Sequence, residues 1–191
     1  MVDFVNAERW VKYPLGLRLL HWVRAVLIFG LIWSGWTMTG LAEDTPMETF
    51  NFFYHNHKQF GVLVWLLAVV HLFLRWQKRA VLPQTPDRLA PWEKALSHFV
   101  HRAIILLTIL VPLLGYSMSS SFTQSDGVPF FFFGEVPELL PKNDTAFEVF
   151  NALHKYGAYA LLCLIVLHIA GAVKHRLTDK GGETDVLPRM L

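Results

Sequence analysis

Nine histidines are the residues of this chain best suited to chemistry, and most of them lie in or beside apolar stretches. Ionisable side chains within apolar stretches are costly to bury, so they are functional candidates by default. His154 and His168 lie fourteen residues apart in one such stretch. On a helix this spacing returns to nearly the same face, about 21 Å further along the axis. The two residues therefore predict one imidazole near each surface of a membrane, both facing the interior of a bundle.

Two histidines from other apolar stretches are predicted to supply a second imidazole at each of these two depths. His57 is expected at the depth of His154, and His21 at the depth of His168. Two neutral imidazoles can fill both axial positions of an iron that only transfers electrons, so the pattern predicts two bis-histidine haems. The chain has one cysteine and therefore no CxxCH attachment motif, which makes these haems b-type.

The spacing leaves one pairing open. His71 follows His57 by fourteen residues and is expected near the depth of His168, so it competes with His21 as a ligand on spacing alone. A metal or proton transporter is the alternative from another functional class. Zinc sites need three or four ligands that converge at one depth, whereas these histidines separate into two levels and the apolar stretches lack carboxylates. The pattern therefore favours electron transfer.

Four apolar runs position these histidines, at roughly 19–41, 58–76, 96–118 and 150–173. About 20 residues of helix cross the ~30 Å of bilayer hydrocarbon, and only helices or closed barrels satisfy their backbone there. The first run exceeds the apolar length of a signal peptide, so it is expected to be a retained span. Short connections make successive helices antiparallel, so residues 1–191 are predicted to form one all-α, four-helix membrane bundle.

Composition and charge agree with this fold and give it an orientation. With 53% hydrophobic residues, 17% charged residues and a net charge of +2, the chain is neither a disordered protein nor a nucleic-acid binder. Basic residues concentrate in the amino-terminal arm, the second connection and the carboxyl-terminal tail: Arg9, Lys12, Arg18, Lys78, Arg79, Arg88, Lys94, Lys174, Arg176, Lys180 and Arg189. The other two connections carry eight acids and only Lys142. The positive-inside rule therefore predicts that both termini are cytoplasmic.

Several segments of the chain resemble a known family. They are LRLLHW, HNHKQFGVLVW, SHFVHRAIILL, VPLLGYSMSS and NALHKYGAYALLCLIVLHIAGAVKHR. Over roughly residues 12–191 they look like the bacterial cytochrome b561 family of small, four-helix, dihaem proteins of the inner membrane. The last of these segments, which covers the fourth apolar run, has the pattern H-x13-H-x6-H and carries the most specific part of the resemblance.

The resemblance implies which histidines are ligands. It makes His21 and His168 the axial ligands of a cytoplasmic haem, and His57 and His154 those of a periplasmic haem. It favours His21 over His71, because family members commonly have arginine at the position of His71. It also favours His57 over the neighbouring His55, because a glycine follows His57 at the spacing of the family.

The resemblance to the family's superoxide oxidase implies a reaction. Superoxide would be oxidised to dioxygen at the periplasmic side, and ubiquinone would be reduced to ubiquinol with cytoplasmic protons. Lys58 and Lys155 follow the proposed periplasmic ligands and are candidates to attract the anion or to contact haem propionates, and Arg24 is a further propionate candidate. The acidic outer connections would instead suit a basic periplasmic redox protein as the partner.

A quinone headgroup needs hydrogen-bond donors beside a haem, at the lipid boundary. Such donors gather near the cytoplasmic ends of the third and fourth runs. The candidates are His98, His101, Arg102 and His175.

Overall fold

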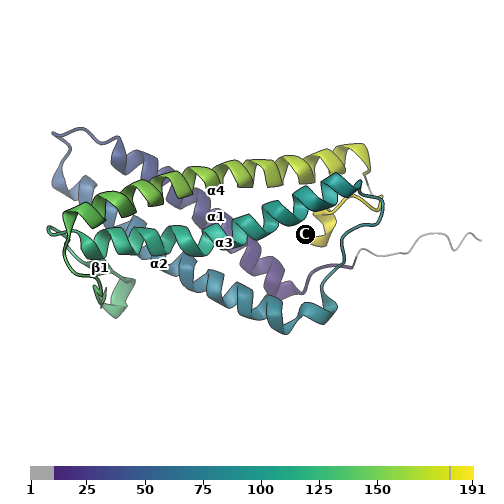
Figure 1. The fold of residues 1–191 in the computed structure, drawn as a ribbon, viewed down its shortest axis with the longest axis horizontal. Coiled ribbons are helices and arrows are strands. Elements are labelled where there is room, and N and C mark those ends of the chain that lie inside the picture. The colour runs from purple at the N-terminus through teal and green to yellow at the C-terminus, as the bar shows by residue number, and fades with distance from the viewer. Residues whose placement is uncertain (1–10, 181) are drawn as a thin grey trace, which may run out of the picture.

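The computed structural model describes residues 11–180 and 182–191 and shows four long helices (Figure 1). They are α1 (Leu15–Thr39), α2 (Met47–Gln77), α3 (Pro91–Ser121) and α4 (Asp144–Thr178). All four are long and apolar enough to cross a membrane. The predicted all-α, four-helix membrane bundle is therefore confirmed. Arg9, one of the basic residues counted above, lies outside the described residues.

α2, α3 and α4 extend beyond the apolar runs that predicted them at both ends, whereas α1 begins earlier than its run and ends at Thr39, two residues before the run does. The helix ends are set by local caps rather than by hydropathy. Pro46 precedes α2, and Pro91 occupies the first position of α3, where a missing N–H costs nothing. The Asn143 side chain caps α4 by accepting a hydrogen bond from the Ala146 N–H. Helices of 31 to 35 residues are about 46 to 53 Å long. They therefore project past the ~30 Å of hydrocarbon at one or both ends.

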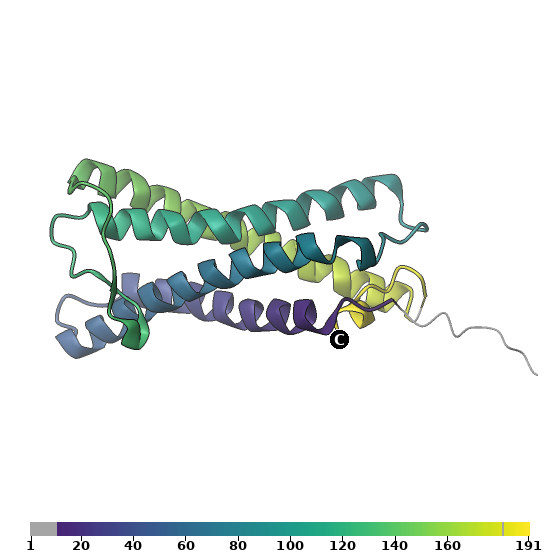
Figure 2. The ribbon, with the colours of Figure 1, turned by 90° about the horizontal axis from the view of Figure 1, so that it is seen from below.

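The bundle consists of two helical hairpins. α1 packs mainly on α2, and α3 packs mainly on α4, while α2 and α3 join the hairpins (Figure 2). The shared core is small and centres on Ile28, Val64 and Leu161. Between 6% and 22% of the most apolar window of each helix is buried. Most apolar side chains thus face lipid or the space between the hairpins.

The segment before α1 from residue 11 on, the carboxyl-terminal tail and the α2–α3 connection, residues 78–90, meet at one end of the bundle, here called the basic end. The Tyr13 N–H donates to the Arg189 carbonyl at 3.0 Å, and Trp22 Nε1 donates to the Met190 carbonyl at 2.9 Å. The Arg189 guanidinium in turn donates to the Gln84 carbonyl at 2.6 Å. This end also contains the short helices η1 (Arg79–Val81) and η3 (Leu187–Arg189). The described parts of the three segments that the sequence marks as basic therefore lie together.

The opposite, acidic end carries the α1–α2 connection and a cap segment, residues 122–143. The cap segment contains β1 (Val128–Pro129), η2 (Phe131–Phe133) and β2 (Glu135–Val136), and its two strands pair antiparallel. Gly134 closes the turn between them at φ 91°, a conformation that favours glycine. Tyr116 on α3 donates from its hydroxyl to the Pro137 carbonyl at 2.6 Å. The cap segment is thus fastened over the acidic end of the bundle.

Candidate haem-binding sites

Two histidine pairs bridge the hairpins. The ring centres of His57 on α2 and His154 on α4 are 6.1 Å apart, and those of His21 on α1 and His168 on α4 are 6.3 Å apart. A metal–imidazole bond is about 2.0 Å long and a ring nitrogen lies about 1.2 Å from the ring centre, so two imidazoles on opposite sides of one iron would have centres about 6.4 Å apart. Both pairs therefore have the separation that an axially ligated iron requires.

Hydrogen bonds set the tautomer of the pair at the acidic end. His154 Nδ1 lies 2.9 Å from the Val111 carbonyl, which can only accept, so this nitrogen carries the proton. His57 Nδ1 lies 2.9 Å from the Ser34 hydroxyl, and that hydroxyl donates its own proton to the Leu31 carbonyl. His57 Nδ1 must therefore donate as well. Both rings keep a lone pair on Nε2, the state in which a histidine binds a metal.

Glycines make room for these two rings. A Cβ added to Gly35 would lie 3.3 Å from His57 Cε1, and one added to Gly115 would lie 2.9 Å from His154 Cε1. At Gly61, one turn after His57, an added Cβ would meet nothing within 4 Å. The two rings thus need glycine opposite them, and the space beside them at Gly61 suits a flat ligand.

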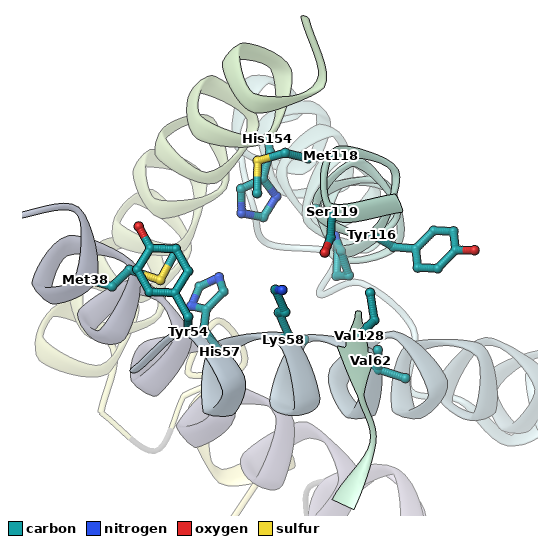
Figure 3. A pocket seen from close by; sticks show the side chains of 13 residues that line it. Met38, Tyr54, His57, Lys58, Val62, Tyr116, Met118, Ser119, Val128 and His154 are labelled. Atoms are coloured by element: carbon teal, nitrogen blue, oxygen red, sulfur yellow. The ribbon is translucent and has the colours of Figure 1, made fainter. Parts of the chain in front are cut away.

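The rings of His57 and His154 face each other across a hollow of about 70 Å³ that is partly open to the outside (Figure 3). The lining residues come from α1, α2, α3, α4 and β1. They are Met38, Tyr54, His57, Lys58, Gly61, Val62, Pro112, Gly115, Tyr116, Met118, Ser119, Val128 and His154. Val128 on β1 places the cap segment at the edge of this hollow.

Lys58 and His55 hold the cap segment in place. The Lys58 ammonium forms an ion pair with Asp126 and donates to the Gly127 carbonyl at 2.8 Å. His55 Nε2 lies 3.0 Å from the second oxygen of Asp126. Partial burial alone would raise the pKa of Asp126, but these two partners outweigh it and hold that pKa below its ordinary value. The His55 ring is thus engaged with the cap segment, while Lys155, beside His154, is exposed.

The pair at the basic end, His21 and His168, has different surroundings. The His101 ring centre lies 4.9 Å from that of His168, which is too close for the two rings to bind opposite sides of one iron. His101 Nδ1 donates to the Ser97 carbonyl at 2.7 Å. Within the described residues, neither His21 nor His168 has a hydrogen-bond partner for its ring. These two rings are therefore positioned by packing and not by hydrogen bonds.

The structure distinguishes His71 from His21. His71 Nδ1 lies 2.5 Å from a terminal nitrogen of Arg24, and a guanidinium has donors only, so Nδ1 accepts and Nε2 carries the proton. A protonated Nε2 is not ready to bind iron. The second terminal nitrogen of Arg24 donates to the Thr108 hydroxyl at 2.8 Å. The geometry thus favours His21 as the partner of His168, and the ligand assignment itself stays a prediction.

The four quinone candidates do not form one site. His98 and Arg102 line a shallow hollow on the exposed face of α3. His101 instead contacts His168 between the helices. His175 lies 3.9 Å from a carboxylate oxygen of Glu93 at the beginning of α3. The structure thus places the predicted set in three different surroundings, and the quinone site stays a prediction.

Sequence reasoning did not single out several residues that shape the sites. Ser34 and Thr108 are buried polar residues in apolar runs, and Gly115 is a glycine within a predicted span. The sequence could have indicated these three residues, because a glycine or a hydroxyl inside a membrane helix usually has a packing or hydrogen-bonding role. Asp126 had no such signal, since its role depends on how the cap segment folds back onto α2.

Comparison with known proteins agrees with the fold and the histidine pattern. A family model described as prokaryotic cytochrome b561 matches residues 12–191. Among curated proteins, cytochrome b561 homolog 2 of Escherichia coli (strain K12) is 28% identical over 197 residues, which cover 100% of this chain and 95% of that protein. The chain therefore belongs to the prokaryotic cytochrome b561 family, whose members bind b-type haem and transfer electrons across membranes.

Proposed function

We propose that the protein transfers electrons between two b-type haems, one held by His57 and His154 and the other by His21 and His168. The observation that carries this proposal is the separation of the two ring pairs, 6.1 Å and 6.3 Å, each suited to one iron. Bound haem would supply a centre that gains and loses one electron, and two axial imidazoles would leave its iron no open position. The protein's own part is to fix those imidazoles at two levels of one bundle.

We further propose that the basic end faces the cytoplasm and the acidic end the periplasm of a bacterial inner membrane. The three basic segments gathered at one end support this orientation through the positive-inside rule.

The proposed reaction joins superoxide oxidation at the acidic end to ubiquinone reduction at the basic end. Two superoxide anions would each lose one electron and leave as dioxygen. One ubiquinone would gain those two electrons and two cytoplasmic protons and leave as ubiquinol. Lys155, exposed beside His154, supports attraction of an anion, and Lys58 lies at the hollow where an anion or a propionate would bind. The hollow at His98 and Arg102 supplies donors for a quinone headgroup.

A second candidate is an electron carrier that serves a basic periplasmic redox protein. The ion pair of Lys58 with Asp126 favours it, because this pairing neutralises one of the two lysines available to attract superoxide. The remaining acids of the acidic end would then steer a positively charged partner, an effect that falls as ionic strength rises.

The decisive experiment uses purified, detergent-solubilised holoprotein. A pyridine haemochrome assay should give two b haems per chain, and one haem or none would contradict the two-haem proposal. Superoxide should then reduce them, and a ubiquinone analogue should reoxidise them. Reduction by a basic cytochrome but not by superoxide would instead support the second candidate.

A matched variant tests the role of Lys155. Lys155→Gln should slow reduction by superoxide and leave reduction by dithionite unchanged in extent. An unchanged rate with superoxide would remove the proposed anion attraction.

A further inference from the structure

Arg24 is a buried cation within a membrane span. Arg24 is only 7% exposed, and it lies three positions after His21 on α1. One terminal nitrogen bonds His71 on α2, the other bonds Thr108 on α3, and Nε is buried without a partner in the described structure. Three helices thus fix the position of the guanidinium beside the ligand pair of the basic end.

The charge of Arg24 has no counter-charge among the described residues. His71 accepts through a neutral ring nitrogen, and Thr108 accepts through a hydroxyl, so both partners are uncharged. No carboxylate in the described residues forms an ion pair with Arg24. A guanidinium stays protonated in proteins, and a charge in low-dielectric surroundings acts strongly on its neighbours. Arg24 is therefore a permanent positive charge at the basic end.

Among the described residues, the acidic end has no equivalent unpaired charge next to its proposed ligands. Lys58, the cation nearest to His57 in sequence, lines the same hollow but is neutralised by its ion pair with Asp126, which is half-exposed to water. Lys155 is exposed, so solvent screens it. A fixed cation favours the more reduced, less positive state of a redox centre beside it. The field of the protein is thus unequal at the two levels.

We propose that Arg24 makes the haem held by His21 and His168 the electron-accepting member of the pair by raising its midpoint potential. This inference rests on the proposed two-haem function. In the transfer, the site at His57 and His154 is oxidised by one electron and the site at His21 and His168 is reduced by one. Arg24 exchanges neither electrons nor protons, so it acts as a positioning residue through its field.

Spectroelectrochemical titration of the full chain tests the proposal. In Arg24→Gln, the midpoint potential of the basic-end haem should fall while that of the acidic-end haem stays constant. At fixed applied potential, its ratio of reduced to oxidised form should fall about fifteenfold, as expected for a unit charge about 10 Å away at an effective dielectric constant near 20. Arg24→Lys should keep the wild-type potential, because it keeps the charge.

Two further variants control for structure. His71→Glu places a carboxylate against the intact Arg24 and should lower the midpoint potential of the basic-end haem. If Arg24→Gln does not retain this haem, His71→Glu alone tests the effect of the Arg24 charge. Arg75→Gln removes a cation one turn further along α2, towards water, and should shift the potential less. No shift in Arg24→Gln or His71→Glu, or an equal shift of both haems, would overturn the proposal. A wild-type protein with fewer than two haems would contradict the proposed function instead.

Discussion

The two histidine pairs share a helix and a ring separation, but their surroundings differ. At the acidic end, hydrogen bonds orient His57 and His154, glycines leave room for both rings, and the cap segment closes the edge. At the basic end, His21 and His168 have no such hydrogen bonds within the described chain and lie beside the charged Arg24. One pair is thus fixed by local contacts, whereas the other is distinguished by the electric field around it.

The largest expected effect separates the two sites. His154→Ala should remove only the acidic-end haem and halve the haem content per chain, because its partner His57 cannot hold the iron alone. A pyridine haemochrome assay measures this. His55→Ala is the matched control and should keep both haems, since its ring contacts Asp126. Retention of two haems in His154→Ala would refute the pairing.

The next comparison concerns the basic end. His21→Ala should lose the basic-end haem, while His71→Ala should keep it, because the His71 Nδ1 is engaged by Arg24 and leaves its proton on Nε2. The reduced-minus-oxidised spectrum of each variant distinguishes the outcomes. Loss of this haem in His71→Ala together with its retention in His21→Ala would reverse the assignment.

A smaller effect tests the glycine clearance. Gly115→Ala would bring a Cβ to 2.9 Å from His154 Cε1, so the ring must shift. Overpacking of this kind costs about 1–3 kcal/mol, and we expect faster loss of the acidic-end haem to a haem acceptor such as apomyoglobin. Gly16→Ala, where an added Cβ meets nothing within 4 Å, should release haem at the wild-type rate. Equal rates in both variants would show that His154 tolerates the methyl group.

The smallest effect is expected at the cap segment. Because the pKa of Asp126 is lowered, its ion pair with Lys58 stabilises the cap segment above the ordinary carboxyl pKa. That contribution is lost only as the pH falls through the lowered value. We measure the hydrogen-exchange rates of residues 122–143 and correct them for their intrinsic pH dependence. Between pH 7 and pH 5 these rates should not rise, because Asp126 stays ionised and keeps its ion pair with Lys58. Asp126→Asn should increase exchange at both pH values. If this variant exchanges like the wild type, Asp126 does not anchor the cap segment.

The fold follows from the sequence because hydropathy and charge act over whole segments. Each apolar run becomes a helix, and the segments rich in basic residues gather at one end. The helix ends differ from the predicted ranges, since residues such as Pro46 and Asn143 decide them locally. Helical spacing also brings the four predicted ligands together in pairs, because a period of 3.6 residues fixes which residues share a face.

Contacts between distant segments are where sequence reasoning fails. The sequence groups His101 with His98 and Arg102, but the packing of α3 on α4 places the His101 ring against that of His168. His71 fits the spacing of a ligand, and only the approach of Arg24 from another helix reveals its tautomer. The anchoring of the cap segment through Asp126 likewise depends on a fold-back that no local pattern encodes.

The division into two hairpins has a consequence for the life of the protein in the cell. Because the shared core is small, a ligand that both hairpins hold would add to the attachment that α2 and α3 provide between them. Such a ligand stabilises the folded state by mass action, by about 2.7 kcal/mol per site at a hundredfold excess over its Kd. The abundance of the protein should therefore follow the cellular supply of haem, with chains that remain empty removed by membrane proteases.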